Sequence, residues 1–397
     1  MVDSMKYADI AAYPESSLSA NIHRLFSDPQ FMALMKKARG LPKLFHKENI
    51  TSLFHWMRTF SSIDEFQAMM YRLIAFNIRT TSDGLWTTGF NTLNKGRPRL
   101  FLSNHRSIAL DTAYLNFALA SHGLSTIYSA AGDNLMKIHW VQHLIRLNKG
   151  FVVKRNVQGM EAKLAEARRL SSYIHELLEE GNSVWIAHRG GRAKNGDDRT
   201  DSAVLNMLAM SGAHDGYEAW SNAVEILPMA ISWEQLPQDE VLAKEVAGEL
   251  DTPTTRRDLL NIVGEINGDK GRVHLAFGRR VTGSRRKEMA RTLDREIQSN
   301  YRLWDANWLA FVRTRSVAPS DRMLVLNHID KKRGERILSR AASLTPAAAA
   351  AFMDMYARPV ENALSHSGSV ASLLADQAER FSAATLMPGR SAQDPSL

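Results

Sequence analysis

The feature that most constrains the fold is the regular alternation of two hydrophobic patterns along residues 81–285. Short apolar runs of strand length alternate with longer segments in which apolar residues recur every three or four positions. Strands joined by helical crossovers pair in parallel, so this alternation predicts an α/β domain with a mostly parallel central sheet flanked by helices. The expected strands are Leu100–Ser103, Gly150–Lys154, Ser183–Ala187, Glu225–Ser232 and Arg272–Gly278, and the expected helices are Ala109–Leu119, Leu135–Leu147 and Met160–Glu179.

Helical patterns also lie on both sides of this α/β domain of residues 81–285. Residues 1–80 read as helical, with one apolar helix face formed by Phe66, Met69, Met70, Leu73 and Ile74. Asp64 is its expected N-cap, and we expect the helix to pack on the main domain; a membrane-surface or substrate-tunnel helix is the alternative. Residues 286–357 predict C-terminal helices, and 358–397 a partly helical tail whose last ten residues we expect to be disordered.

Composition excludes several kinds of chemistry. The 397 residues include no cysteine, which rules out disulfides, Cys-ligated zinc, iron–sulfur clusters and a thiol nucleophile. The formal net charge of +8 predicts attraction to phosphate on nucleic acid, anionic lipid or a small molecule. Met1–Tyr13 lacks the pattern of a secretory signal. No apolar run reaches the roughly 18 residues of a spanning helix, so only binding at a membrane surface stays open.

One segment places reactive side chains at the end of an expected strand. Asn104-His105-Arg106-Ser107 follows an apolar run, and Asp111 comes six positions after the histidine. Ligand sites of α/β sheets lie where strands end and helices begin. A carboxylate beside an imidazole fixes its tautomer and stabilises the imidazolium. The spacing leaves a structural histidine as the alternative, and the two side chains meet only if the chain turns between them.

Four ordered blocks carry a resemblance to a known family. They are Asn104-His105-Arg106-Ser107 with Asp111, Gly150-Phe-Val-Val-Lys-Arg155, Val184-Trp-Ile-Ala-His-Arg-Gly-Gly-Arg-Ala-Lys194 and Ile226-Leu-Pro-Met-Ala-Ile231. Over about residues 85–285 the sequence resembles the glycerolipid acyltransferases, which include 1-acylglycerol-3-phosphate acyltransferases, and it looks like a bacterial cytoplasmic branch of them. The resemblance implies transfer of a fatty acyl group from an acyl thioester, on coenzyme A or acyl carrier protein, to a hydroxyl of a lysophospholipid or glycerol-phosphate acceptor. It also implies a cytoplasmic protein, peripheral at the inner face of the membrane.

The resemblance also implies roles for individual residues. His105 is then the general base that takes the proton of the acceptor hydroxyl, and Asp111 orients it, so that neither an enzyme nucleophile nor a cofactor is needed. Arg155 and Arg192 are the implied phosphate ligands, because an arginine fork matches phosphate oxygens. Lys154, Lys194 and Arg189 are neighbouring cations; Asn104, Arg106, Ser107, Gly190 and Gly191 complete the candidate site loops. Without the resemblance, a solvated basic loop is the alternative.

Two positions depart from the family's pattern. One residue more than usual separates His105 from Asp111, and the turn between them can absorb it. The third block lacks the glutamate that usually precedes its glycine, because Gly190 occupies that position. The acidic residues that can replace it are Asp197, Asp198 and Glu225. A catalytically weak relative that binds or delivers lipids is therefore the alternative to an enzyme.

Two further signals predict no chemistry. His139 and His143 lie one turn apart on an expected helix without an evident third ligand, so we expect no metal site. A basic cluster is formed by Arg279, Arg280, Arg285, Arg286 and Lys287. A solvated face is its favoured interpretation, followed by docking of anionic lipid or acyl carrier protein. Nucleic acid is the least favoured partner, since no aromatic interleaving or binding motif accompanies the cluster.

Overall fold

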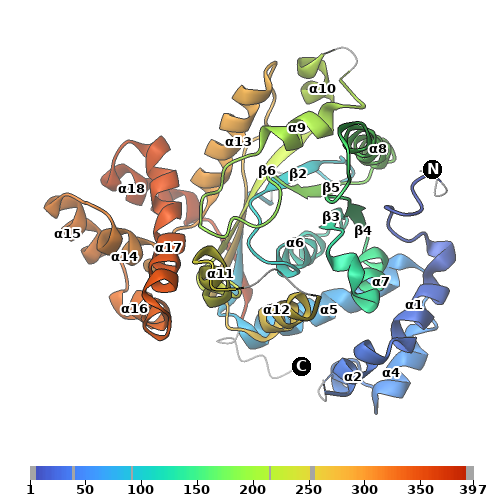
Figure 1. Ribbon diagram of the computed structural model, residues 1–397. Coiled ribbons are helices and arrows are strands. Elements are labelled where there is room, and N and C mark those ends of the chain that lie inside the picture. The colour runs from blue at the N-terminus through green and yellow to red at the C-terminus, as the bar shows by residue number, and fades with distance from the viewer. Residues whose placement is uncertain (1–5, 38–40, 91–92, 214–215, 251–254, 390–397) are drawn as a thin grey trace.

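The computed structural model describes residues 6–37, 41–90, 93–213, 216–250 and 255–389 and contains one central sheet with the strand order β4-β3-β5-β2-β6-β7-β1-β8 (Figure 1). The pairs β6–β7 and β1–β8 are antiparallel, and the other neighbours are parallel, which confirms the predicted mostly parallel sheet. The strands are β1 (Gly84–Thr88), β2 (Leu100–Ser103), β3 (Tyr128–Gly132), β4 (Gly150–Val153), β5 (Val184–Ala187), β6 (Ile226–Trp233), β7 (Arg272–Phe277) and β8 (Thr385–Pro388).

Helices cover the sheet and extend from both of its sides. Those of the first part of the chain are α1 (Leu18–Ser27), α2 (Pro29–Lys37), α3 (Leu41–Leu44), α4 (Ile50–Met57), α5 (Ile63–Thr81), α6 (Leu110–Ser121), α7 (His139–Leu147), α8 (Met160–Glu179), α9 (Ser202–Ala209) and α10 (Tyr217–Ala223). Those of the second part are α11 (Asp239–Val246), α12 (Thr255–Asn267), α13 (Arg286–Asn300), α14 (Asp305–Thr314), α15 (Pro319–His328), α16 (Lys331–Leu338), α17 (Pro346–Ser367) and α18 (Val370–Phe381). Among the described residues, no helix is both long and apolar enough to cross a membrane.

The central strand β2 separates two hydrophobic cores. All four of its residues are buried, as expected for a strand covered on both faces. Side chains alternate along a strand, so Phe101 joins the core that includes Tyr114 of α6, while Leu102 joins the core that includes Ile174 of α8 and Leu293 of α13. The loop that follows β2 is therefore held between two packed layers.

The N-terminal helices form a third core beside the sheet. Side chains of α1, α4, α5 and α7 meet there, among them Leu25, Leu53, Phe66 and Val141. The position of the N-cap of α5 corrects our expectation. Ser62, not Asp64, begins this helix, because the Ser62 hydroxyl accepts the N–H of Glu65 at 3.2 Å and the Glu65 carboxylate accepts the N–H of Ser62 at 3.3 Å.

Several elements differ from those that the sequence predicted. The expected helix Leu135–Leu147 is broken at Ile138, whose extended backbone separates a short 3-10 turn from α7. Strands β1, β3 and β8 were not predicted. The tail expected to be partly helical contains α18 and also β8, which pairs antiparallel with β1. The boundary expected after residue 357 falls inside α17, which continues through the buried Pro359. Of the last ten residues, 390–397 lie outside the described residues.

Candidate active site

The first block of the sequence lies where β2 ends and α6 begins. Because β5 and β6 run parallel to β2, the third and fourth blocks come to the same edge of the sheet. Asn104 joins this loop to β6: its side-chain amide donates to the carbonyl oxygen of Ile231 and its side-chain oxygen accepts the N–H of Ile231, both at 2.9 Å. Asn104 is fully buried, so its role in this structure is to fix the position of His105.

The chain turns so that His105 meets Asp111. Nδ1 of His105 lies 2.8 Å from Oδ2 of Asp111. The same oxygen accepts the backbone N–H groups of Arg106 at 2.7 Å and Ser107 at 3.0 Å, which closes the turn that the spacing requires. The other oxygen accepts the indole N–H of Trp233 at 3.0 Å. Four donors therefore fix a carboxylate that is itself buried.

This geometry prepares the imidazole for proton transfer. With Nδ1–H donated to the carboxylate, the lone pair of Nε2 is left to accept a proton. The His105 ring meets the Trp185 ring edge-on, with 5.6 Å between the centroids, and 17% of the His105 side chain is exposed. Asp111 can stabilise the imidazolium through the 2.8 Å contact. The pair can act as a general base on a hydroxyl that arrives from outside.

Arg106 links the first block to the third and is buried. Its guanidinium donates to the carbonyl oxygens of Ala193 at 2.9 Å and Gly196 at 3.3 Å, and it forms an ion pair with Asp198. The N–H of Ala193 in turn donates to the carbonyl oxygen of His105 at 3.2 Å. Through these contacts, Arg106 holds the third block beside His105.

The predicted phosphate ligands occupy different surroundings. Arg155 is exposed, and its guanidinium lies against two glycines: a Cβ added to Gly132 would lie 3.2 Å from its Cζ, and one added to Gly191 would lie 3.9 Å from its Nη1. The side chain therefore extends from the second block to the third. Arg192 is mostly buried, with 12% of its side chain exposed, and its Nη1 lies 3.3 Å from Oε1 of Glu265.

The two lysines expected beside these arginines are held by carboxylates. Nζ of Lys154 lies 2.5 Å from Oδ2 of Asp9 and 3.4 Å from Oε1 of Glu166. Nζ of Lys194 lies 2.9 Å from Oε2 of Glu245. A phosphate at either lysine would have to compete with these carboxylates, which makes the arginines the better ligands.

The glycine turn of the third block is open to solvent. Gly190 is exposed and a Cβ there would contact nothing within 4 Å. Gly191 has φ +76°, a left-handed conformation that favours glycine. Arg189 donates to the carbonyl oxygen of Asp197 at 3.0 Å, across the base of this turn.

The three acidic residues expected to replace the family's glutamate have other partners. Asp198 pairs with Arg106, and Asp197 lies 3.1 Å from Nε of Arg199. Glu225 precedes β6 and pairs with Arg99 at 3.1 Å, so it lies at the opposite edge of the sheet from His105.

The carboxylate that does contact the first block belongs to Glu265 of α12. Its Oε2 accepts the hydroxyl of Ser107 at 2.7 Å and the N–H of Ile108 at 2.8 Å, and its side chain is fully buried. Burial raises the pKa of Glu265 to about 7, although the Arg192 guanidinium and the Ser107 hydroxyl act to lower it. Sequence reasoning missed this residue because it lies outside the four blocks and its contact with α6 is purely tertiary.

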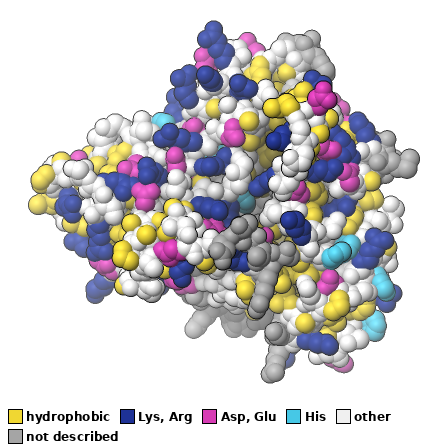
Figure 2. Space-filling view, in the orientation of Figure 1, with side chains coloured by type: hydrophobic (Ala, Val, Ile, Leu, Met, Phe, Trp, Pro, Cys, Tyr) yellow, Lys and Arg dark blue, Asp and Glu magenta, His cyan; other side chains and the backbone are white. Residues whose placement is uncertain are grey.

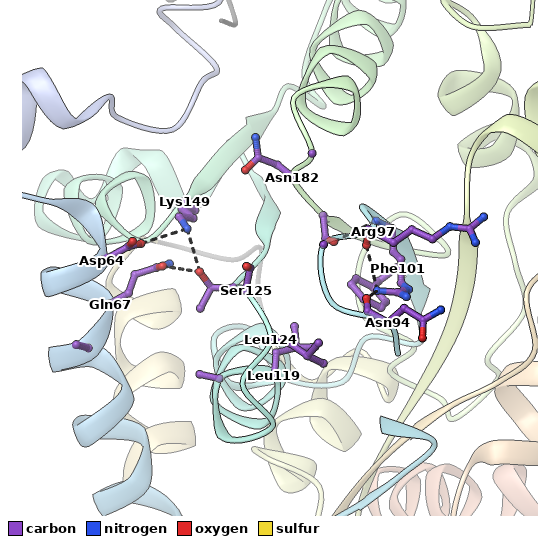
Figure 3. Close-up of a pocket in the computed structure, with 17 residues that line it drawn as sticks. Asp64, Gln67, Asn94, Arg97, Phe101, Leu119, Leu124, Ser125, Lys149 and Asn182 are labelled. Atoms are coloured by element: carbon purple, nitrogen blue, oxygen red, sulfur yellow. Dashed lines mark hydrogen bonds and ion pairs between the residues drawn. The ribbon is translucent and has the colours of Figure 1, made fainter. Parts of the chain in front are cut away.

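A cavity and the basic cluster both lie away from His105. The cavity has a volume of about 440 Å³ and is lined by residues that precede β2, β4 and β5, among them Arg97, Lys149 and Asn182 (Figure 3). Figure 2 shows Lys and Arg side chains gathered over the upper end of α13, where the basic cluster of residues 279–287 lies. The N–H of Val281 donates to the carbonyl oxygen of Ile226, which places this cluster at the amino end of β6.

Three comparisons with known proteins each found a similarity. Residues 86–232 match the family model named Acyltransferase. A curated relative, dihydroxyacetone phosphate acyltransferase of Bos taurus, is 23% identical over 184 residues; the match covers 46% of this chain and 26% of the relative, about a quarter of its length. The 1-acyl-sn-glycerophosphate (LPA) acyltransferase PlsC of Thermotoga maritima aligns with 70% of this chain and 91% of its own, at 16% identity and a TM-score of 0.35.

Proposed function

We propose that this chain, whose residues 86–232 match the Acyltransferase family model, transfers a fatty acyl group from an acyl thioester to a hydroxyl of a phosphate-bearing glycerolipid acceptor. The donor is acyl coenzyme A or acyl carrier protein, and the acceptor is a lysophospholipid or a glycerol phosphate. The observation that carries this proposal is the 2.8 Å contact of His105 with the buried Asp111. We place the reaction in the cytoplasm, at the inner face of a membrane.

The proposed chemistry needs one base and no enzyme nucleophile. Nε2 of His105 takes the proton of the acceptor hydroxyl as its oxygen attacks the thioester carbonyl carbon. The tetrahedral intermediate collapses with cleavage of the C–S bond, and the imidazolium returns the proton to the departing thiolate. Asp111 stabilises the imidazolium in between. General-base assistance of this kind is worth about 10² to 10⁴ in rate.

Binding of the acceptor is assigned to the two arginines. Arg155 is exposed and extends beside Gly191, so a phosphate at this point meets a guanidinium and the glycine turn. Arg192 approaches the same turn from within the fold and keeps donors beyond its contact with Glu265. Two forked cations suit a phosphate dianion better than the paired lysines do.

A panel of donors and acceptors tests the proposal. Purified protein is incubated with acyl coenzyme A or acyl carrier protein and with glycerol 3-phosphate, dihydroxyacetone phosphate or a lysophospholipid. We expect acylated product from at least one pair, and its loss by a factor of about 10² or more in His105→Ala. His139→Ala is the matched control, because this exposed histidine begins α7 and, among the described residues, has no hydrogen bond to His105 or Asp111.

Two results would contradict the proposal. Wild-type protein that forms no product with any pair would exclude the enzyme. Lipid binding by the wild type, together with turnover that His105→Ala leaves unchanged, would favour the alternative of a lipid-binding relative.

A further inference from the structure

We infer that Glu265 is a positioning residue that joins the phosphate ligand Arg192 to the loop carrying His105, and so determines how well the acceptor binds. The inference rests on the proposed function. Glu265 lies outside the segment that matches the family model, and it stands where three parts of the site meet: α12, the start of α6 and the third block.

One oxygen of Glu265 holds the start of α6. The first N–H groups of a helix lack partners within the helix, and oxygen acceptors stabilise them. Oε2 of Glu265 accepts the N–H of Ile108 at 2.8 Å and the hydroxyl of Ser107 at 2.7 Å, and that hydroxyl accepts the N–H of Leu110 at 2.9 Å. Asp111 closes the same turn from the other side. The His105 loop thus lies between two carboxylates.

The other oxygen of Glu265 holds Arg192. Nη1 of Arg192 lies 3.3 Å from Oε1, which restrains a long side chain that follows a glycine turn. Among the residues that the structure describes, the remaining guanidinium nitrogens of Arg192 have no protein partner. A guanidinium has five N–H donors, so those left over can bind phosphate oxygens while Glu265 holds the group in place.

The helix that carries Glu265 is itself fixed. Asn77 of α5 donates to the carbonyl oxygen of Ile266 at 2.6 Å and accepts the Tyr114 hydroxyl of α6 at 3.0 Å. Gly264 packs so closely that a Cβ there would lie 2.5 Å from Nε2 of Gln238. Burial of a carboxylate costs free energy unless hydrogen bonds and an opposite charge compensate it, and a rigid helix holds the group in reach of such partners. Glu265 is therefore well placed to orient Arg192 and the loop that carries His105.

Steady-state kinetics of Glu265→Gln test the inference. The amide keeps an oxygen acceptor for Ser107 and Ile108 but removes the charge that faces Arg192. We expect the KM for the acceptor to rise about tenfold, the KM for the thioester to stay unchanged and kcat to change by less than about threefold. Glu335→Gln is the matched control, because Glu335 pairs with Arg313 on the exposed face of α16.

A double variant separates positioning from general loss of structure. If Glu265 acts through Arg192, Glu265→Gln added to Arg192→Gln raises the acceptor KM no further than Arg192→Gln alone. If Glu265→Gln fails to fold, Glu265→Asp keeps the charge at a shorter reach, and the same acceptor-specific rise is expected. Calorimetric titration with glycerol 3-phosphate, without thioester, measures the same loss of affinity without turnover.

The outcomes distinguish this inference from the proposed function. Wild-type protein that acylates no acceptor would overturn the proposed function. Active wild type with an unchanged acceptor KM in Glu265→Gln, or additive effects in the double variant, would overturn the role of Glu265 alone.

Discussion

At the scale of single residues, the site depends on carboxylates that accept several donors at once. Asp111 accepts four, from His105, Arg106, Ser107 and Trp233. The motif with its aspartate could be found in the sequence because its members lie close together along the chain. Glu265 could not, because nothing in the pattern of an amphipathic helix shows which distant loop one of its side chains will contact.

The charge of Asp111 is expected to matter more than its shape. Asp111→Asn keeps the size of the side chain but cannot stabilise an imidazolium, and its amide would face the N–H groups of Arg106 and Ser107. We expect kcat to fall by about 10² to 10⁴. Turnover of the folded variant, checked by circular dichroism, measures this; activity within threefold of wild type would contradict the role of the aspartate.

At the scale of elements, the buried strands were easier to predict from the sequence than the half-buried ones. The run that forms β2 was found because a strand covered on both faces is continuously apolar. The run Tyr128–Gly132 of β3 was missed because four of its five residues are half-buried and only Tyr128 is large, so the run lacks the apolar pattern of a buried strand. The expected helix at Leu135–Leu147 had a continuous apolar pattern, and that pattern does not reveal the extended backbone of Ile138. The periodicity of apolar residues indicates which side chains are buried, but it does not indicate where a helix is interrupted.

The N-cap of α5 gives a test at this scale. Ser62→Ala removes the hydroxyl that accepts the N–H of Glu65 and should lower the free energy of unfolding by about 1 kcal/mol. Asp64→Ala should cost less, about 0.5 kcal/mol, because Asp64 is exposed and acts only on the helix dipole and on Lys149 at 3.7 Å. Chemical denaturation compares the stabilities of the two variants. A larger loss of stability in Asp64→Ala than in Ser62→Ala would show that Asp64 is the N-cap.

At the scale of the whole molecule, one buried carboxylate joins the sheet to the C-terminal helices. Glu234 follows β6 and is fully buried. It pairs with Arg272 of β7 at 2.8 Å and with Arg333 of α16 at 2.5 Å. Burial acts to raise the pKa of Glu234, but the hydrogen bonds from Arg333 and Arg272 outweigh it and bring this pKa down to about 2.

The sign of the resulting pH dependence follows from this shift. The folded state loses the proton more readily than the unfolded state, so the carboxylate stabilises the fold above about pH 4.5, and that stability is lost as the pH falls towards 2. Glu234→Gln removes the buried anion that Arg272 and Arg333 share, although Arg272 keeps Asp305 and Arg333 keeps Asp83 as partners, and it should cost about 3 kcal/mol at pH 7. Denaturation at pH 7 and pH 3 measures both effects: the variant should lose less stability on acidification than the wild type.

The pairing of β1 has a consequence for the order in which the chain assembles during synthesis. Strands β2 to β6 can pair with one another before the last part of the chain is translated, because all five lie between Leu100 and Trp233. β1 emerges before all of them, yet Gly84 pairs with Arg272 and Pro388. The earliest strand must therefore wait for the latest ones. A nascent chain would hold an unpaired strand through most of its translation, and closure of that edge of the sheet would be among the last steps of folding.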